Sequence, residues 1–129
     1  MIDEFVKGYS NSYATYSLGQ KRYYSCLQYI DGVVGNSSSG LLEAPSFNIA
    51  TIDIGDRQKG RIKADSVISC SPTQESIRSA FDKSYSEDFQ NIVDNTKNPY
   101  GNGGASKIVV DIIKNFDLNG MLKKTFYDL

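Results

Sequence analysis

The 129-residue chain contains no histidine and no tryptophan, and it has only three prolines and two cysteines. Without histidine it lacks the side chain that most often acts as a general base near neutral pH. Carboxylates, tyrosines or lysines would have to carry any proton transfer. Cys26 and Cys70 form no CxxC pair, so we expect buried thiols of a reduced cytosolic protein, with neither a metal nor another cofactor.

An excess of one charge is also missing, because 14 basic and 15 acidic residues leave a formal net charge of −1. Such a chain has no global field to recruit nucleic acid or an anionic membrane, so we expect neither as a partner. No apolar stretch approaches the length of a membrane span, and residues 1–7 do not resemble a signal peptide. We therefore predict a cytoplasmic protein in which any anion site is local.

Short β-rich and helical segments alternate along a chain whose length suits a single domain. The order predicts right-handed βαβ crossovers over a parallel sheet, which is an α/β fold. Strands are expected at residues 13–16, 33–35, 50–54 and 66–70. Helices are expected at residues 2–7, at 18–29, after the turn at 36–40 up to Pro45, from Pro72 onward, around 89–93, at 108–116 and at 118–129.

Two finer predictions concern the helix that begins near Pro72. Ser71 is expected as its N-cap, with Pro72 in the first position and Gln74 completing a capping box. Its buried residues should be Ile77, Ala80 and Phe81. In the helix at 18–29, tyrosines at helical spacing predict core packing rather than a recognition surface.

Residues 33–45 join a short apolar strand to a hydroxyl-rich turn and a helix-compatible segment. This arrangement gathers hydroxyls and N–H groups at a helix N-terminus, where an anion is favoured. About one turn further, Glu43 is placed to accept hydrogen bonds from the vicinal hydroxyls of a sugar. An ordinary capped turn explains the same residues, so a phosphate site is one of two interpretations.

The chain has one basic cluster, at residues 55–63, directly after the strand expected at 50–54. A solvated loop is the simple interpretation of such a cluster. However, loops that follow parallel strands lie at the carboxyl edge of the sheet, where α/β proteins bind ligands. The turn at 36–40 also follows a strand, so both loops should share that edge. The forked guanidinium of Arg57 beside a hydroxyl-rich turn would suit a diphosphate.

Several stretches together resemble the UDP-N-acetylglucosamine 2-epimerase family, most closely its hydrolysing branch, which supplies sugars for sialic-acid-like nonulosonates. The resemblance covers residues 16–116 in order and spacing. Asn102 departs from it, because the family commonly has Asp after Tyr-Gly. The stretches that carry the resemblance are residues 35–40 with 43–45, residues 54–61, residues 98–101 with Gly103 and 105–106, and upstream residues 17–20 with Tyr23.

The resemblance implies two Rossmann-like domains of the GT-B type with the nucleotide sugar between them. Residues 1–129 would then be one incomplete C-terminal nucleotide-binding domain, truncated at its start. The family's catalytic carboxylates and histidine would lie outside this chain, so no catalytic residue is expected here. By resemblance, Ser37 and Ser38 would bind the diphosphate of UDP or a UDP-sugar, Glu43 the ribose hydroxyls, and Arg57 would lie near the nucleotide.

Three hypotheses for function follow. In the first, the chain is the UDP-binding part of a hydrolysing epimerase and is inactive alone. In the second, it is a non-catalytic nucleotide-binding or regulatory module. In the third, it is a truncated product that forms homo-oligomers, because a sheet without its first strands has an unpaired edge.

Overall fold

Three short parallel strands form the centre of the computed structural model, which describes residues 1–120. The strands are β1 (Gly32–Gly35), β2 (Ala50–Ile54) and β3 (Val67–Cys70), in the order β1-β2-β3. Val34, Ile52 and Ile68 are in register across the sheet. Central β2 is buried along all but its last residue, as expected for a strand covered on both faces. The predicted α/β fold is therefore confirmed as a partial Rossmann-like domain.

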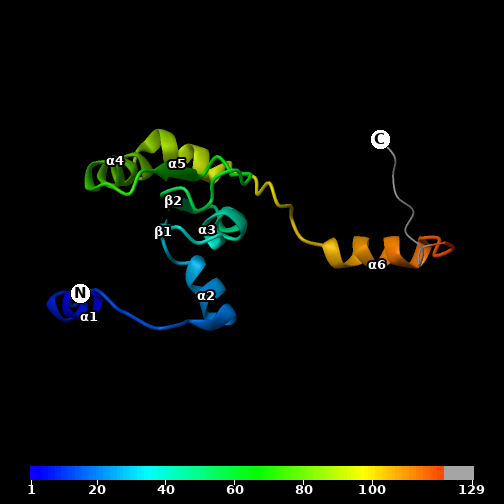
Figure 1. Ribbon diagram of the computed structural model, residues 1–129. Coiled ribbons are helices and arrows are strands. Elements are labelled where there is room, and N and C mark those ends of the chain that lie inside the picture. Colours follow the sequence, from blue (N-terminus) through cyan, green and yellow to red (C-terminus); the bar gives the residue numbers. More distant parts are fainter. Residues whose placement is uncertain (121–129) are drawn as a thin grey trace.

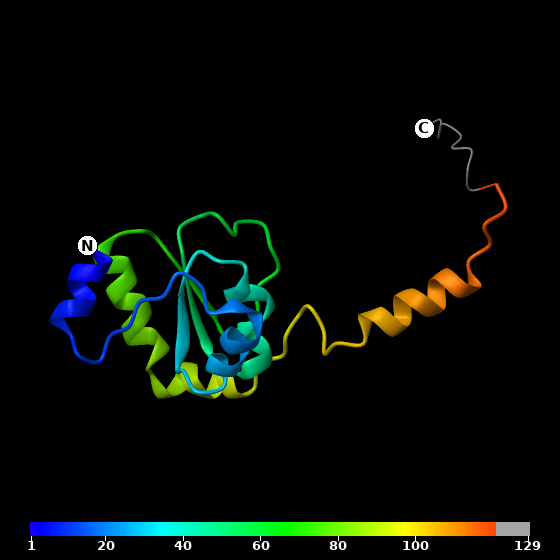
Figure 2. The same cartoon turned by 90° about the horizontal axis from the view of Figure 1, so that it is seen from below.

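Helices cover both faces of this sheet (Figure 1). α4 (Gln74–Ser84) and α5 (Glu87–Asp94) lie on one face. α2 (Gly19–Leu27), α3 (Ser39–Leu42) and the 3-10 helix η1 (Ala44–Phe47) lie on the other. The remaining helices are α1 (Ile2–Gly8) and α6 (Ala105–Asn115). Figure 2 shows that α6 extends away from the sheet. Within residues 1–120, no helix has the length and apolar character needed to cross a membrane.

Each face of the sheet has its own apolar core. Under α4 and α5 the buried residues are Ala50, Ile52, Ile68, Ala80, Phe89 and Val93. On the opposite face they are Leu27, Ala44 and Ile49, with half-buried Tyr23, Tyr24, Val33 and Phe47 packed against them. The predicted core role of the tyrosines in α2 is thus confirmed for Tyr23 and Tyr24.

The strand predicted at residues 13–16 is wrong. This segment is irregular, and its tyrosines, Tyr13 and Tyr16, are 91% and 111% exposed. Tyrosine and threonine favour strands, but a strand also needs a neighbour to pair with, and residues 13–16 do not pair with any strand of the described sheet. The helix predicted at 118–129 is not present at residues 118–120, and the rest of it lies outside the described residues.

The cap and the buried residues predicted for α4 also need correction. The N-cap is Thr73, whose Oγ1 accepts the Ser76 N–H at 3.3 Å, while the Ser71 N–H donates to Ser76 Oγ. Thr73 supplies the same capping chemistry two residues later than expected. Of the three residues expected in the core, Ala80 is buried, Ile77 is half-buried and Phe81 is 39% exposed.

The prediction that both thiols are buried is wrong as well. Cys26 is exposed and Cys70 is half-buried. Cys26 precedes buried Leu27 in α2, and consecutive helical residues point in different directions. Cys70 is the last residue of β3, which has β2 as its one neighbour in the described sheet.

Candidate functional site

The serine turn (residues 36–38) and the basic loop (residues 55–66) leave the same edge of the sheet. The first follows β1 and the second follows β2, and these strands are parallel neighbours in which Gly35 pairs with Asp53. The sequence prediction that both loops share the carboxyl edge is therefore correct. Gly35 has φ of +148°, which non-glycine residues rarely adopt, so a glycine suits the sharp exit from β1.

The serine turn presents hydroxyl groups at this edge. Ser37 is exposed and its Oγ accepts the Ser39 N–H at 3.4 Å. Ser38 is half-buried and is the N-cap of α3, but within the described chain its side chain makes no capping hydrogen bond. Since α3 has only four residues, its dipole is small, and the hydroxyls are the main groups that the turn offers to a ligand.

The position of α3 against the sheet depends on Gly40. A Cβ at this residue would lie 2.6 Å from Thr51 Cγ2, closer than real Cβ contacts allow. The Thr51 hydroxyl also donates to the Gly40 carbonyl at 2.9 Å. On its other side, α3 is held by a hydrogen bond between the Tyr23 hydroxyl and Ser39 Oγ. The serine turn is therefore fixed between β2 and α2.

Glu43 is the C-cap of α3, about 7.5 Å from Ser38 along the helix axis at 1.5 Å per residue. Its side chain is half-buried, and Oε2 is shielded from solvent without a hydrogen-bond partner among residues 1–120. A shielded carboxylate oxygen without a donor is costly, and no side chain or main-chain group among residues 1–120 offsets that cost.

Asn36 connects the serine turn to the basic loop. Its Oδ1 lies 3.5 Å from Arg57 Nη1, and its main-chain carbonyl accepts a hydrogen bond from Gln58 Nε2 at 2.7 Å. Arg57 is exposed, whereas Gln58 is buried. These contacts bring the Arg57 guanidinium to Asn36, the first residue of the serine turn.

The turn at residues 98–101 lies against both parts of the site. Asn98 Nδ2 donates to the Leu42 carbonyl at 2.8 Å and to Ser46 Oγ at 2.6 Å, on the α3 side. The Tyr100 hydroxyl donates to the Ile62 carbonyl of the basic loop at 3.0 Å. The turn at residues 98–101 thus contacts both the α3 segment and the basic loop.

The sequence does not predict the contact of Gln58 with Asn36, because the acceptor is a main-chain carbonyl that has no sequence signal. The buried ion pair between Asp53 and Lys63 was also missed, although a carboxylate inside an otherwise apolar strand was a usable signal.

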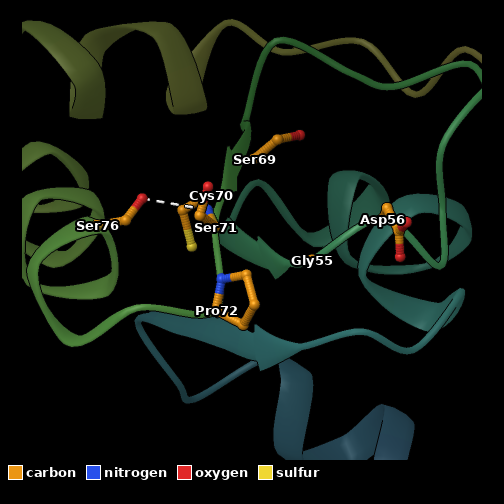
Figure 3. A pocket seen from close by; sticks show the side chains of 7 residues that line it. All are labelled: Gly55, Asp56, Ser69, Cys70, Ser71, Pro72 and Ser76. Atoms are coloured by element: carbon orange, nitrogen blue, oxygen red, sulfur yellow. Dashed lines mark hydrogen bonds between the residues drawn. The ribbon is translucent and has the colours of Figure 1, made fainter.

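A hollow of about 600 Å³ lies beside this site, at the carboxyl ends of β2 and β3 (Figure 3). None of the four predicted site residues lines it. Burial, with a smaller effect from the Asp53 charge, raises the pKa of the Cys70 thiol above its ordinary value. The lining residues are Gly55, Asp56, Ser69, Cys70, Ser71, Pro72 and Ser76.

The fold and the site define an α/β protein with a partial Rossmann-like domain and two ligand-accessible loops at its carboxyl edge. The model of the UDP-N-acetylglucosamine 2-epimerase family matches residues 1–114. Since this match covers most of the sequence, the chain belongs to that family.

Individual relatives agree with this assignment. The chain is 40% identical to the polysialic acid biosynthesis protein P7 of Escherichia coli, over 99% of this chain and 33% of that protein. It is 37% identical to the GDP/UDP-N,N′-diacetylbacillosamine 2-epimerase (hydrolyzing) of Campylobacter jejuni, over 100% of this chain and 35% of that protein. The chain therefore spans about a third of the length of the curated relatives it matches.

Proposed function

We propose that this chain is the C-terminal, UDP-binding part of a hydrolysing UDP-N-acetylglucosamine 2-epimerase. The observation that carries the proposal is the contact of Arg57 and Gln58 with Asn36, because it brings a cation to the serine turn. The whole protein would convert UDP-N-acetylglucosamine and water to an N-acetylmannosamine-type sugar and UDP.

The groups around the serine turn match the parts of UDP. The hydroxyls of Ser37 and Ser38 donate to diphosphate oxygens, and the Arg57 guanidinium binds the same group through paired N–H donors. Glu43, the half-buried C-cap of α3, accepts hydrogen bonds from the ribose hydroxyls. Some names of relatives specify UDP-N-acetylglucosamine and others UDP-N,N′-diacetylbacillosamine, and UDP is the part common to both.

In the reaction that we propose for the whole protein, a base removes the proton at sugar C2 and UDP leaves by anti elimination. Water then adds to the resulting glycal to give the 2-epimer. Negative charge grows on the departing diphosphate, where Arg57 and the serine hydroxyls would stabilise it in a preorganised way. The acid and base groups would come from outside this chain, so we expect the chain alone to be inactive.

Calorimetric titration of UDP into the 129-residue chain tests the assignment. We expect saturable 1:1 binding, weakened about 10-fold by Glu43→Ala and by Ser38→Ala, because each removes a hydrogen bond to or from a charged group. Glu87→Ala, which changes an exposed carboxylate at the start of α5, serves as the control and should bind as wild type. Binding that is insensitive to both site variants would contradict the proposal.

A regulatory nucleotide-binding module would bind UDP in the same way, so a second experiment is needed to separate the two. Adding the missing part of a longer relative should restore turnover of UDP-N-acetylglucosamine if the chain is part of the enzyme. UDP binding that persists without turnover would favour the regulatory module.

A cytoplasmic location is part of the proposal, since reducing conditions suit the unpaired Cys26 and Cys70.

Self-association is a second candidate property, favoured by the outer edge of β1. This strand pairs on one side with β2, and its other side has no partner strand among the described residues. Beside it, exposed Val34, Phe81 and Tyr85 line a small groove. Such an edge promotes strand addition between copies. Light scattering on the purified chain tests this, and a monomer at all concentrations would exclude it.

A further inference from the structure

An ion pair with one buried and one half-buried partner lies beneath the basic loop. Asp53, near the end of β2, is 1% exposed, and its Oδ2 lies 2.7 Å from Lys63 Nζ. Lys63 Nζ also donates to Ser69 Oγ on β3 at 2.6 Å. A single side chain near the end of the basic loop is thus bonded to both strands that the loop connects.

The basic loop carries four cations, at residues 57, 59, 61 and 63, and they differ in their surroundings. Lys63 turns inward, and its charge is neutralised by Asp53. Lys59 and Arg61 are exposed. Arg57 contacts the neutral Asn36 side chain, and no ion pair of Arg57 occurs within residues 1–120. Its charge is therefore free for an anionic ligand.

An ion pair with a buried carboxylate adds little to the free energy of folding, because the cost of removing that charge from water offsets the attraction. Such a pair does favour one geometry, since the buried Asp53 carboxylate is costly to leave without its cation. Here the geometry that it favours has the loop drawn down onto β2 and β3. Asp53 is paired in the sheet with Gly35, the residue directly before the serine turn. The pair is thus close to the point where the loops meet.

We propose that Asp53 and Lys63 are positioning residues that hold the basic loop in place, so that Arg57 and Gln58 meet the serine turn before the ligand arrives. This rests on the proposed UDP site, and it adds that binding depends on a charge pair that does not touch UDP. Without the ion pair between Asp53 and Lys63, the basic loop would have to become ordered when UDP binds, and this cost lowers the affinity for UDP.

The test compares wild type with the double variant Asp53→Asn/Lys63→Met, which removes both charges together and so leaves no unpaired buried ion. Three quantities are measured: the melting temperature, the affinity for UDP by calorimetry, and the rate of tryptic cleavage after Lys59 and Arg61 without UDP. We expect a melting temperature within a few degrees of wild type, about 10-fold weaker binding and at least several-fold faster cleavage. The single variant Lys63→Arg, which retains the charge, should bind UDP and resist trypsin as wild type does.

Lys59→Met is the matched control, because it removes an exposed cation from the same loop without touching Asp53, and it should change UDP affinity less than 3-fold. Unchanged affinity and unchanged cleavage at Arg61 in the folded double variant would overturn the proposal. If the double variant does not fold, Ser69→Ala removes one acceptor of Lys63 and is tested in the same way. Failure of wild type to bind UDP would instead refute the proposed function, while the cleavage rates still decide whether the pair holds the loop.

Discussion

α5 and α6 have similar sequence patterns and very different surroundings. Both carry apolar residues at helical spacing. In α5, Phe89 and Val93 are buried in the core. In α6, Ile108 and Ile112 are 60% and 58% exposed, and the helix extends away from the sheet (Figure 2). The spacing of apolar residues therefore predicts a helix and its apolar side, whereas burial depends on a neighbour supplied by another part of the chain.

The largest difference between the two helices should appear in stability. Phe89→Ala removes a ring from the core and should lower the free energy of unfolding by about 3–5 kcal/mol. Ile112→Ala, at an exposed position of α6, should change it by less than about 0.5 kcal/mol. Urea denaturation followed by circular dichroism measures both. Equal losses would show that α6 is covered in solution and that it is buried as α5 is.

Close packing under the serine turn gives the next largest effect. Gly40→Ala places a methyl group against Thr51 and should cost about 1–3 kcal/mol through overpacking. It should also weaken UDP binding, because α3 must shift. Gly8→Ala is the control, since a Cβ there meets nothing within 4 Å. If Gly40→Ala matched this control in stability and in UDP affinity, the tight contact between α3 and β2 would be disproved.

α5 and α6 should also differ in the hydrogen exchange of their main-chain amides, which needs only local opening of the helix. An isolated helix of 11 residues is marginally stable in water, so amides in α6 should exchange orders of magnitude faster than those of Ile92 and Val93 in α5. Exchange followed by mass spectrometry on the intact chain measures this. Equal protection would mean that α6 packs against a partner. If that partner is a second copy of the chain, the protection of α6 should increase with protein concentration.

The two cysteines provide the smallest contrast. Cys26 is exposed, whereas burial raises the pKa of half-buried Cys70 and lowers its thiolate fraction at any given pH. At pH 8, iodoacetamide should therefore label Cys26 first. The rate at Cys70 should still be rising with pH where an ordinary thiol is already ionised, since its pKa is raised. Faster labelling of Cys70 at pH 8 would contradict this order.

The elements that the sequence predicted correctly are those with a strong local signal. β1, β2 and β3 are short apolar runs between turns, and α2 and α5 have clear helical spacing. The βαβ connections between these strands then predicted that the strands are parallel and that the serine turn and the basic loop leave the same edge of the sheet. The false strand at residues 13–16 and the exposed α6 share a physical cause, because both were judged from their own residues while their burial depended on a neighbour.

The candidate site was predicted in part. Motif spacing identified the serine turn and the basic loop, and the structure brings Arg57 to Asn36 as that prediction requires. The roles of Ser37, Ser38, Glu43 and Arg57 in binding UDP remain predictions. The buried pair of Asp53 and Lys63 was missed, because two residues ten positions apart share no motif and meet only when the loop folds back onto the sheet.

The central claim is that the serine turn and the basic loop bind UDP together, and amide chemical-shift mapping tests it most directly. When UDP is titrated into the ¹⁵N-labelled chain, we predict the largest shifts at Ser37, Ser38, Glu43 and Arg57. Shifts confined to the hollow around Ser71 and Ser76, or no shifts at saturating UDP, would contradict the account.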